Sequence, residues 1–476
     1  MGFEAFDLPE GLILDPVSGT ITGSLPVKGE HALRLRVTNA LGAAERTLRI
    51  IVGDEIALTP PMGWNSWNIW GGKVSQEKVL AAARAMVGSG LRDHGWTYVN
   101  IDDGWQGLRG GELNAIQPNK KFPDMAALAN EVHALGLKFG IYSTPWRTSF
   151  HGHIGSSADY EDGSNDWIRS GTHTDLFKYR FPKFESGLET FALLKPWAAR
   201  LKEKEREKIT RQLRTFGKFS FVKPDVAQWK AWGVDYLKYD WVPIDLAHTE
   251  EMGRELKASK RDIVYSVANN APFSIAPELS RLTNSWRTSG DVKDDWRRLS
   301  KTGFSRQRWA RFSGPGRYND PDMLVVGEVG WGKPRRTKLS SDEQYTQMSL
   351  WCLLSAPLLL GCDLEKLDPF TLGLLTNPEV LEVNQDGLCR QATRVSRRGR
   401  IEVYSKPMED GSRAVGIFNR GGAAAKGTVR WSDLGTPGSQ TVRDLWRQKD
   451  LGIYAENFEA EVSPHGVVLV RVNAAK

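Results

Sequence analysis

Strand-like and helix-like segments alternate between residue 58 and about residue 385, and this alternation restricts the fold more than any other feature of the sequence. Apolar residues recur at helical spacing at 76–89 and at 125–135. Strand-like runs lie at residues 63–68, 98–102, 139–143, 236–239, 263–267, 286–291, 323–326 and 357–360. Such alternation over about 330 residues predicts a parallel sheet with helices packed on it. About eight strand–helix units close into a (β/α)8 TIM barrel, which is the fold we expect.

The segments on both sides of this region predict β structure without helices. Residues 1–53 contain alternating apolar and polar runs, which indicate a small β module. After about residue 385, short alternating runs separated by Gly- and Asp-rich turns predict an antiparallel β-sandwich. The expected domains are the module at 1–53, the barrel at 54–387 with an insertion at about 146–230, and the sandwich at 388–476. Within the barrel, Ser340 and Glu343 have the spacing of a capping box and predict the start of a helix.

The composition excludes several classes of protein. The chain is 40% hydrophobic and 25% charged, which is typical of a soluble globular protein. Its three cysteines cannot build a disulfide framework, and their spacings fit no zinc site. The longest apolar run, at residues 350–361, is too short to cross a bilayer and contains Pro357, so we expect no membrane insertion. Most of the 18 tryptophans are expected to fill the core.

The net charge of +7 comes from one segment. Residues 195–223 contain ten Lys or Arg and three Glu, which accounts for the whole excess. The rest of the chain is balanced, so no nucleic-acid partner is expected. Glu and Lys or Arg alternate at helical spacing between residues 201 and 214, which favours a solvated helix on the rim of the barrel.

Acidic residues follow several of the predicted barrel strands. They are Asp102, Asp103, Asp240, Asp291, Asp320 and Asp322. The carboxyl ends of barrel strands converge on one mouth, where barrel enzymes have their active sites. We therefore expect these carboxylates to lie close together, although they are far apart in the sequence.

An acid after a strand is often only the N-cap of the next helix, and that interpretation suits Asp294 or Asp295. It does not suit Asp240, because the sequence Trp-Val-Pro follows it instead of a helix start. Lys238 lies two residues before Asp240, so both side chains point to the same side of the strand. An ammonium there keeps Asp240 ionised, as a nucleophile requires. The alternative is a plain ion pair inside the barrel.

Two carboxylates with separate roles are what glycoside hydrolysis requires. One attacks the anomeric carbon or activates water, and the other protonates the leaving oxygen. Arg287 lies four residues before Asp291 and can orient that acid or a sugar hydroxyl, or it can be a structural residue. Two adjacent charges at Asp102 and Asp103 can be explained by bound sugar hydroxyls or by a bound metal. No His accompanies them, so sugar hydroxyls are at least as good an explanation. The sequence has no nucleotide loop, serine elbow or zinc motif, so neither a cofactor nor a metal is expected.

Nine segments carry motifs of one enzyme family. They are LTPPMGWNSWN (58–68), YVNIDDGWQ (98–106), KFGIYS (138–143), YLKYD (236–240), IVYS (263–266), SWRTSGD (285–291), GPGRYNDPDMLVVG (314–327), SLWCLLSAPLLLGCDL (349–364) and EVLEVNQD (379–386). With these motifs, in this order, the chain resembles glycoside hydrolase family 27, the α-galactosidase and α-N-acetylgalactosaminidase family. The resemblance covers about residues 58–390. Residues 1–53 are more weakly similar to an Ig-like module of bacterial proteins.

The resemblance implies a retaining barrel enzyme with a C-terminal β-sandwich and assigns roles to individual residues. It makes Asp240 the nucleophile and Asp291 the general acid and then base. It further implies substrate-binding roles for Trp67, Asp102, Asp103, Tyr142, Lys238 and Arg287. Asp102 and Asp103 bind hydroxyls near C4 and C6 in this scheme. Many family members pair a Cys two residues after the nucleophile, but Val242 stands there, so that disulfide is absent.

The segment that starts at Ser266, YSVANNAP, is the one that the resemblance assigns to the C2 substituent of the sugar. It places Ala268 and Ala271 at the two discriminating positions. Small residues leave room for an N-acetyl group but give it no hydroxyl to bond, so galactose is favoured and N-acetylgalactosamine stays open. The short Asp102 side chain favours a hexose over arabinopyranose.

Three alternatives remain at this point. The enzyme can act on another glycon of the same family, or the chain can be a carbohydrate-binding protein that has lost catalysis, although it retains Asp240 and Asp291. The basic segment at 195–223, with Trp197, can be a flap that restricts the leaving group or favours acidic or sulfated galactans. No leader is visible, but the Ig-like module and a polysaccharide-type substrate predict a periplasmic or secreted protein.

Overall fold

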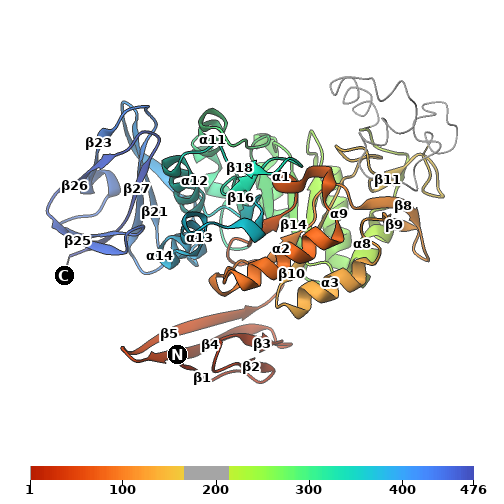
Figure 1. Cartoon of the computed structure of the whole chain (residues 1–476), viewed down its shortest axis with the longest axis horizontal. Helices are drawn as coiled ribbons and strands as arrows, with labels where there is room; N and C mark the ends of the chain where they lie inside the picture. Colours follow the sequence, from red (N-terminus) through yellow and green to blue (C-terminus); the bar gives the residue numbers. More distant parts are fainter. Residues whose placement is uncertain (1, 166–213, 476) are drawn as a thin grey trace. The chain divides into compact units, whose positions relative to one another are not determined.

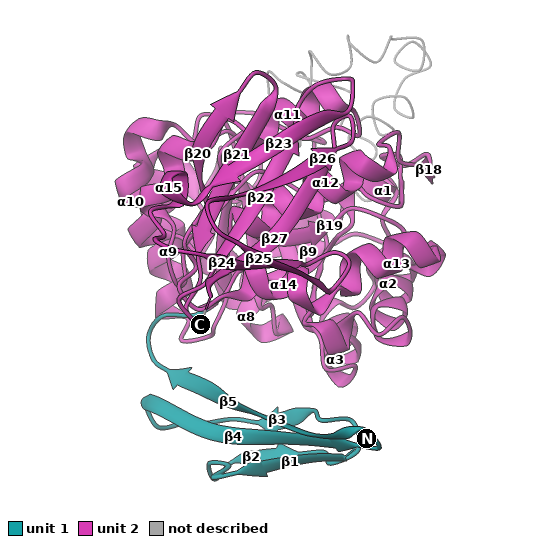
Figure 2. Cartoon of the chain, turned by 90° about the vertical axis from the view of Figure 1, so that its left-hand side faces the viewer, with its two compact units in different colours: residues 1–56 teal, residues 57–476 magenta. Residues whose placement is uncertain are grey.

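The computed structural model describes residues 2–165 and 214–475, in two compact units, Met1–Ile56 and Ala57–Lys476 (Figure 2). The smaller unit contains β1 (Gly2–Phe6), β2 (Leu12–Leu14), β3 (Ile21–Gly23), β4 (Gly29–Asn39) and β5 (Gly42–Val52). Strands β1, β4 and β5 form one antiparallel sheet, and β2 pairs with β3. Leu33 is its one buried apolar side chain among the described residues, so this unit has little core.

The larger unit contains a sheet of eight parallel strands (Figure 1). In chain order they are β6 (Met62–Asn65), β7 (Tyr98–Asn100), β10 (Lys138–Ser143), β13 (Tyr236–Asp240), β14 (Val264–Ala268), β15 (Ser285–Arg287), β16 (Tyr318–Asp320) and β19 (Leu358–Leu360). From β6 to β16 each barrel strand pairs with the next one along the chain, and β19 pairs with β6. A parallel bridge between Leu324 and Leu360 joins β19 to the segment after β16. The predicted (β/α)8 barrel is confirmed.

A helix follows every strand of the barrel. These helices are α2 (Gln76–Gly88), α3 (Met125–Ala134), α8 (Val222–Trp232), α9 (Leu246–Ala258), α10 (Ala276–Leu282), α11 (Trp296–Gly303) and α12 (Ser341–Leu353), with α13 (Pro369–Thr376) and α14 (Pro378–Gln385) after the last strand. A one-turn helix, α1 (Trp67–Trp70), follows β6 directly. The strand–helix order gives each strand a crossover long enough for parallel pairing.

Short polar side chains fix where several of these helices begin. Asp124, Asp245 and Asp295 accept hydrogen bonds from the free backbone N–H groups of α3, α9 and α11. Ser340 and Glu343 form the predicted capping box of α12. The N-cap interpretation is therefore confirmed for Asp295, and the cap of the helix after β13 is Asp245, five residues beyond the strand-end Asp240.

One predicted strand is wrong. Residues 323–326 form no strand, and the seventh barrel strand is β16, five residues earlier. The backbone breaks at Asp322, whose φ of +89° does not fit an extended strand. The apolar run after Asp322 is nevertheless buried, because it packs in the core where Leu324 closes the barrel.

The C-terminal part of the larger unit is an antiparallel β-sandwich, as predicted. Its strands are β20 (Thr393–Arg398), β21 (Ile401–Pro407), β22 (Arg413–Asn419), β23 (Ala425–Arg430), β24 (Gln440–Asp444), β25 (Lys449–Tyr454), β26 (Asn457–Val462) and β27 (Val467–Ala474). Six of them form one sheet, and β23 and β26 form the other. Apolar residues of both sheets pack in one cluster that includes Val415, Ile417, Val429 and Phe458.

Among the described residues, eleven of the chain's 18 tryptophans are buried, which agrees with the expectation that most of them fill the core, and eight of these are fully buried. These eight are Trp64, Trp96, Trp105, Trp229, Trp241, Trp286, Trp309 and Trp351. None of the helices within 2–165 and 214–475 has the length and apolarity that a membrane crossing requires. Most of the basic segment at 195–223, including Trp197, lies outside the described residues.

Candidate active site

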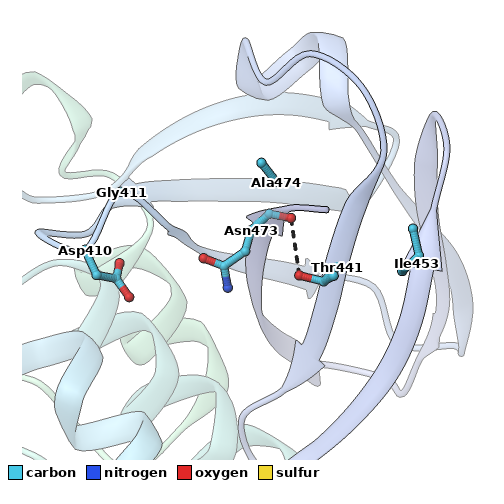
Figure 3. Close-up of a pocket in the computed structure, with 6 residues that line it drawn as sticks. All are labelled: Asp410, Gly411, Thr441, Ile453, Asn473 and Ala474. Carbon is cyan, nitrogen blue, oxygen red and sulfur yellow. Dashed lines mark hydrogen bonds between the residues drawn. The ribbon is translucent and has the colours of Figure 1, made fainter. Parts of the chain in front are cut away.

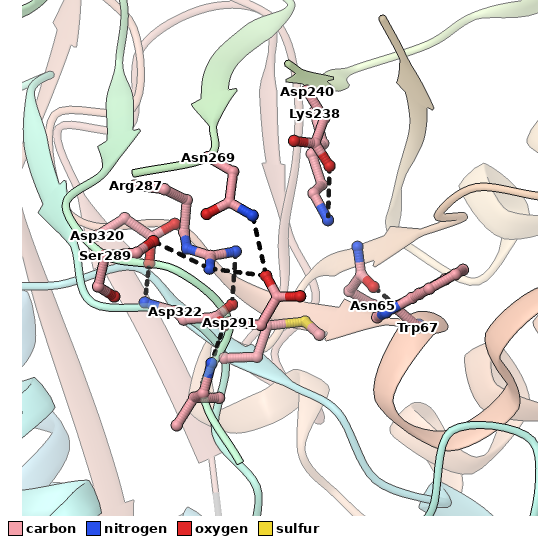
Figure 4. Close-up of polar contacts among 12 residues, drawn as sticks. Asn65, Trp67, Lys238, Asp240, Asn269, Arg287, Ser289, Asp291, Asp320 and Asp322 are labelled. Atoms are coloured by element: carbon pink, nitrogen blue, oxygen red, sulfur yellow. Dashed lines mark hydrogen bonds and ion pairs between the residues drawn. The ribbon is translucent and has the colours of Figure 1, made fainter. Parts of the chain in front are cut away.

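A cavity of about 630 Å³ lies where barrel strands of the larger unit end. It is lined by Trp67, Asn68, Asp102, Asp103, Tyr142, Trp146, Phe150, His151, Arg214, Lys238, Asp240, Val242, Asn269, Arg287, Asp291, Asp322 and Met323. Figure 4 labels several of its polar side chains, among them Lys238, Asp240, Asn269, Arg287, Asp291 and Asp322, which come from strand ends and the loops after them. The expected convergence is thus observed for five of the six strand-end carboxylates, whereas Asp320 is buried and does not line the cavity. The cavity has the size of a small-molecule site.

A second cavity, of about 610 Å³, lies on the β-sandwich (Figure 3). Its lining residues are Asp410, Gly411, Thr441, Ile453, Asn473 and Ala474. It has one carboxylate and therefore lacks the pair that glycoside hydrolysis requires.

Lys238 joins two strand ends by electrostatic contacts. Its ammonium lies 2.8 Å from Asp102 Oδ2 and 4.0 Å from Asp240 Oδ2. Asn65 Nδ2 donates a second hydrogen bond of 2.8 Å to the same oxygen of Asp102. Burial lowers the pKa of Lys238, but the charges of Asp102 and Asp240 outweigh burial and raise it above its ordinary value. The ammonium is therefore a fixed positive charge beside both carboxylates.

Asp240 is the more deeply placed of the two candidate catalytic acids. Its side chain is 10% exposed, against 52% for that of Asp291. Burial raises the pKa of Asp240 to about 6, although the Lys238 ammonium opposes this. The expectation that Lys238 favours the ionised form is correct in sign, but burial outweighs it. At neutral pH Asp240 is still ionised, as a nucleophile must be.

Asp291 is held on one oxygen by two donors. Arg287 Nη2 approaches Asp291 Oδ1 to 3.2 Å, and Asn269 Nδ2 donates to the same oxygen at 3.1 Å. Burial raises the pKa of Asp291, but the charges of Arg287 and Lys238 outweigh burial and hold it below its ordinary value. Of the alternatives for Arg287, the contact with this acid is present.

Asp322 fixes Arg287 from the other side. Its Oδ1 lies 2.8 Å from Arg287 Nη1, and its Oδ2 accepts a hydrogen bond of 2.6 Å from the backbone of Val292. Burial raises the pKa of Asp322 to about 6, with Arg287 opposing. Asp322 thus links the Arg287 guanidinium to the backbone next to Asp291 through charge-assisted hydrogen bonds.

Asp103 also lines the cavity and is buried. Its Oδ2 accepts a hydrogen bond of 2.9 Å from the backbone of His151. Burial raises the pKa of Asp103 to about 7, so it is present in both proton states near neutral pH. Burial also lowers the pKa of His151 to about 4, which leaves the imidazole neutral. In the described part of the chain, no group of three or more His, Cys, Asp or Glu could hold a metal ion.

Buried polar atoms without a partner among the described residues include Asp103 Oδ1, Asp240 Oδ1, Asn269 Oδ1 and Asn68 Nδ2, which all belong to cavity residues. A buried polar atom without a partner is costly unless water or a ligand satisfies it. Unpartnered acceptors and a donor at one cavity suit a ligand that carries several hydroxyl groups, because a hydroxyl can both donate and accept.

Eight of the predicted site residues line this cavity, and three do not. The eight are Trp67, Asp102, Asp103, Tyr142, Lys238, Asp240, Arg287 and Asp291. Ser266, Ala268 and Ala271 are buried and are not among the lining residues. Ser266 contacts the phenol of Tyr236 instead. The cavity wall in this segment is formed by Asn269, so contacts of the two alanines with a sugar stay a prediction.

Several lining residues escaped the prediction from sequence. Asp322 could be predicted as a site residue because it is one of the strand-end acids. Its ion pair with Arg287 could not be predicted from the sequence. Asn269 lies inside YSVANNAP, between Ala268 and Ala271, which are predicted to face the C2 substituent. Trp146, Phe150, His151 and Arg214 come from both ends of the long insertion, where no regular pattern marks them.

The comparisons with known proteins agree with this geometry. The family model described as Alpha galactosidase A matches residues 59–186 and 211–386, and the model of the Alpha galactosidase C-terminal beta sandwich domain matches 398–472. Alpha-galactosidase 2 of Arabidopsis thaliana is 31% identical over 436 residues, which are 90% of this chain and 93% of that protein.

Solved structures of related proteins share the fold over most of the chain. One from Bacteroides fragilis, provisionally described as an alpha-galactosidase/melibiase, has a TM-score of 0.80 and 29% identity and covers 99% of this chain and 91% of its own. A β-L-arabinopyranosidase of Geobacillus stearothermophilus has a TM-score of 0.68 and 26% identity, with 88% and 97% covered. The chain therefore belongs to the alpha-galactosidase family, glycoside hydrolase family 27.

Proposed function

We propose that the protein is a retaining α-galactosidase, which removes terminal α-linked galactose from oligosaccharides, polysaccharides or glycoconjugates. The observation that carries the proposal is the pairing of two carboxylates in different surroundings on one cavity. Asp240 is buried beside Lys238, and Asp291 is half-exposed and held by Arg287. The family membership and the name of the Arabidopsis relative support galactose as the glycon.

The reaction proceeds in two displacements. In the first, Asp240 attacks C1 of galactose, the C1–oxygen bond breaks, and Asp291 gives its proton to the leaving oxygen. This leaves galactose bound to Asp240 through an ester. In the second, Asp291 takes a proton from water, the water oxygen attacks C1, and Asp240 leaves as a carboxylate. Each displacement inverts C1, so the α configuration is kept.

The first sugar released is expected to be α-galactose, because two inversions restore the starting configuration. Proton NMR of a concentrated enzyme reaction measures the anomeric signal before mutarotation equilibrates the two forms. A β signal that appears first would contradict the covalent intermediate and would point to direct attack by water.

The pH profile of kcat/KM is expected to be bell-shaped, with its alkaline limb near pH 6. The active form has Asp240 ionised and Asp291 protonated, so the pair must hold one proton. The two pKa values place that proton on Asp240 in most molecules, so the active form is the minor one of the two one-proton forms. Burial raises the pKa of Asp240 to about 6, and the charges of Arg287 and Lys238 outweigh the burial of Asp291 and hold its pKa low. Above pH 6 or so the pair holds no proton, and below the lower pKa it holds two. Initial rates on nitrophenyl α-galactoside across about pH 3 to 8 test this, and a rate that still rises above neutrality contradicts it.

The glycon is tested with nitrophenyl α-galactoside, α-N-acetylgalactosaminide and β-L-arabinopyranoside. The galactoside is expected to have the highest kcat/KM, by about tenfold or more, since a missing or added ring substituent changes several contacts. The structural likeness to a β-L-arabinopyranosidase makes that glycon the second candidate. A highest value for either of the other two substrates overturns galactose and keeps the enzyme class. Hydrolysis of none of the three, with binding of galactose retained, supports the carbohydrate-binding alternative.

We also propose that the enzyme works in the periplasm or outside the cell, since polymeric and conjugated galactosides are met there. Fractionation of the source cells with an antibody against this chain tests the location, and recovery in the cytoplasm alone overturns it.

A further inference from the structure

Asn269 lies in the cavity wall next to Asp291, in the loop that follows β14 (Figure 4). Its Nδ2 is 3.1 Å from Asp291 Oδ1. Only an amide nitrogen can donate to a carboxylate, and Arg287 donates to the same oxygen, so the orientation of the Asn269 amide is set by this contact. The other amide atom, Asn269 Oδ1, is buried and has no partner among the described residues.

The backbone on both sides of Asn269 is fixed by the neighbouring strand ends. Its N–H donates to Trp241 O at 3.2 Å, and the N–H of Trp241 donates to Ala268 O at 2.8 Å. Ala271 N–H donates to Arg287 O at 2.7 Å. The loop is thus attached to the residue after Asp240 on one side and to Arg287 on the other. A side chain on so firmly held a loop keeps its position at low entropic cost.

The two carboxylate oxygens of Asp291 differ in their hydrogen bonds, because both donors contact Oδ1 and no described residue donates to Oδ2. An oxygen that accepts from Arg287 and from Asn269 is a poor place for a proton, because a proton there would face two donors. The proton of the acid is therefore carried by Oδ2, the oxygen free to reach the leaving group.

We propose that Asn269 is a positioning residue of the reaction, which together with Arg287 holds Oδ1 of Asp291 and so directs the acidic proton on Oδ2 at the leaving oxygen. This inference rests on the proposed glycosidase function. It assigns Asn269 no contact with the reacting atoms. Its effect on catalysis passes through Asp291 alone.

The test compares Asn269→Ala with Asn270→Gly on two galactosides. Asn270 is the exposed neighbour with a φ of +54°, which Gly adopts without strain, so Asn270→Gly is a matched control. For Asn269→Ala, kcat/KM on an alkyl galactoside, whose leaving group needs a proton, is expected to fall about 10- to 100-fold. On 2,4-dinitrophenyl α-galactoside, whose leaving group needs none, it should change less than about threefold. Asn270→Gly should match wild type on both.

The acidic limb of the pH profile gives a second readout. A hydrogen bond to the ionised form of an acid lowers its pKa, so its loss in Asn269→Ala raises the pKa of Asp291. The acidic limb of kcat/KM is expected to move up by about half a pH unit. Equal losses on both substrates with an unmoved limb show a merely structural role and overturn the inference, as does the same pattern in Asn270→Gly.

If thermal unfolding shows that Asn269→Ala does not fold, the isosteric Asn269→Asp replaces it. Its carboxylate faces Asp291 where the donor stood, so the acidic limb is expected to move up further, and an unmoved limb overturns the contact. Wild-type protein that hydrolyses neither galactoside overturns the proposed function and this inference with it. Wild-type activity with equal losses overturns this inference alone.

Discussion

Asp240→Asn is expected to lose kcat by about 10⁴-fold or more, because the amide cannot form the covalent intermediate on which the double displacement depends. Nitrophenyl α-galactoside hydrolysis under saturating conditions measures the loss. In Asp240→Ala, azide can take the place of the missing carboxylate and attack from the same side. The expected product is β-galactosyl azide, which NMR distinguishes from its α anomer. Turnover of Asp240→Asn close to that of wild type contradicts the assignment of the nucleophile.

The loss in Asp240→Asn is not expected to come from unfolding. Burial raises the pKa of Asp240 to about 6, so the folded chain binds this proton more tightly than the unfolded chain. Above both pKa values the ionised Asp240 therefore lowers the free energy of unfolding, and a neutral amide removes this cost. We expect the Tm of Asp240→Asn at pH 7 to equal or exceed that of wild type. Asp295→Asn, which keeps a good N-cap on α11 outside the cavity, is the matched control and should retain full turnover.

Asp291→Ala is expected to have an effect that depends on the leaving group. Galactosides with alkyl or sugar leaving groups should lose about 10²- to 10⁴-fold in kcat/KM, which is the usual contribution of general acid catalysis. With 2,4-dinitrophenyl α-galactoside the first displacement needs no proton, so kcat/KM should change by less than about tenfold. The second displacement then limits the rate, because no base activates water, and a burst of dinitrophenol followed by slow turnover is expected.

Azide and the pH profile separate Asp291→Ala from a simply damaged enzyme. Azide needs no base and attacks the galactosyl ester on Asp240, so the expected product is α-galactosyl azide, the opposite anomer to that from Asp240→Ala. The alkaline limb of kcat/KM should disappear for the dinitrophenyl substrate, because its leaving group needs no proton and the variant has no acid to lose one. Equal losses for all leaving groups, or a β azide, would show that Asp291 is not the acid.

The two catalytic predictions rest on residues that the sequence could already mark. Asp240 and Asp291 follow strands, and neither caps a helix in the structure, whereas Asp295 does. The barrel could be predicted because helical and strand periodicity are local properties of the chain. The sequence predicts the seventh strand at residues 323–326 because this run is apolar, but the strand lies at Tyr318–Asp320. Residues 323–326 pack in the core after a break at Asp322, and periodicity does not distinguish such a run from a strand.

The sequence by itself determined the class of fold and the order of the domains, because strand and helix periodicity are local patterns, and it predicted Asp240 and Asp291 as the two candidate acids. Only the tertiary structure decided how the acids are surrounded. Lys238 donates a hydrogen bond to Asp102, which is 136 positions away in the sequence, and Asn269 donates one to Asp291, which is 22 positions away. The pKa of Asp240 depends on burial by segments from several strands. Such contacts arise when the barrel closes and brings distant strand ends to one mouth, and no stretch of sequence encodes them alone.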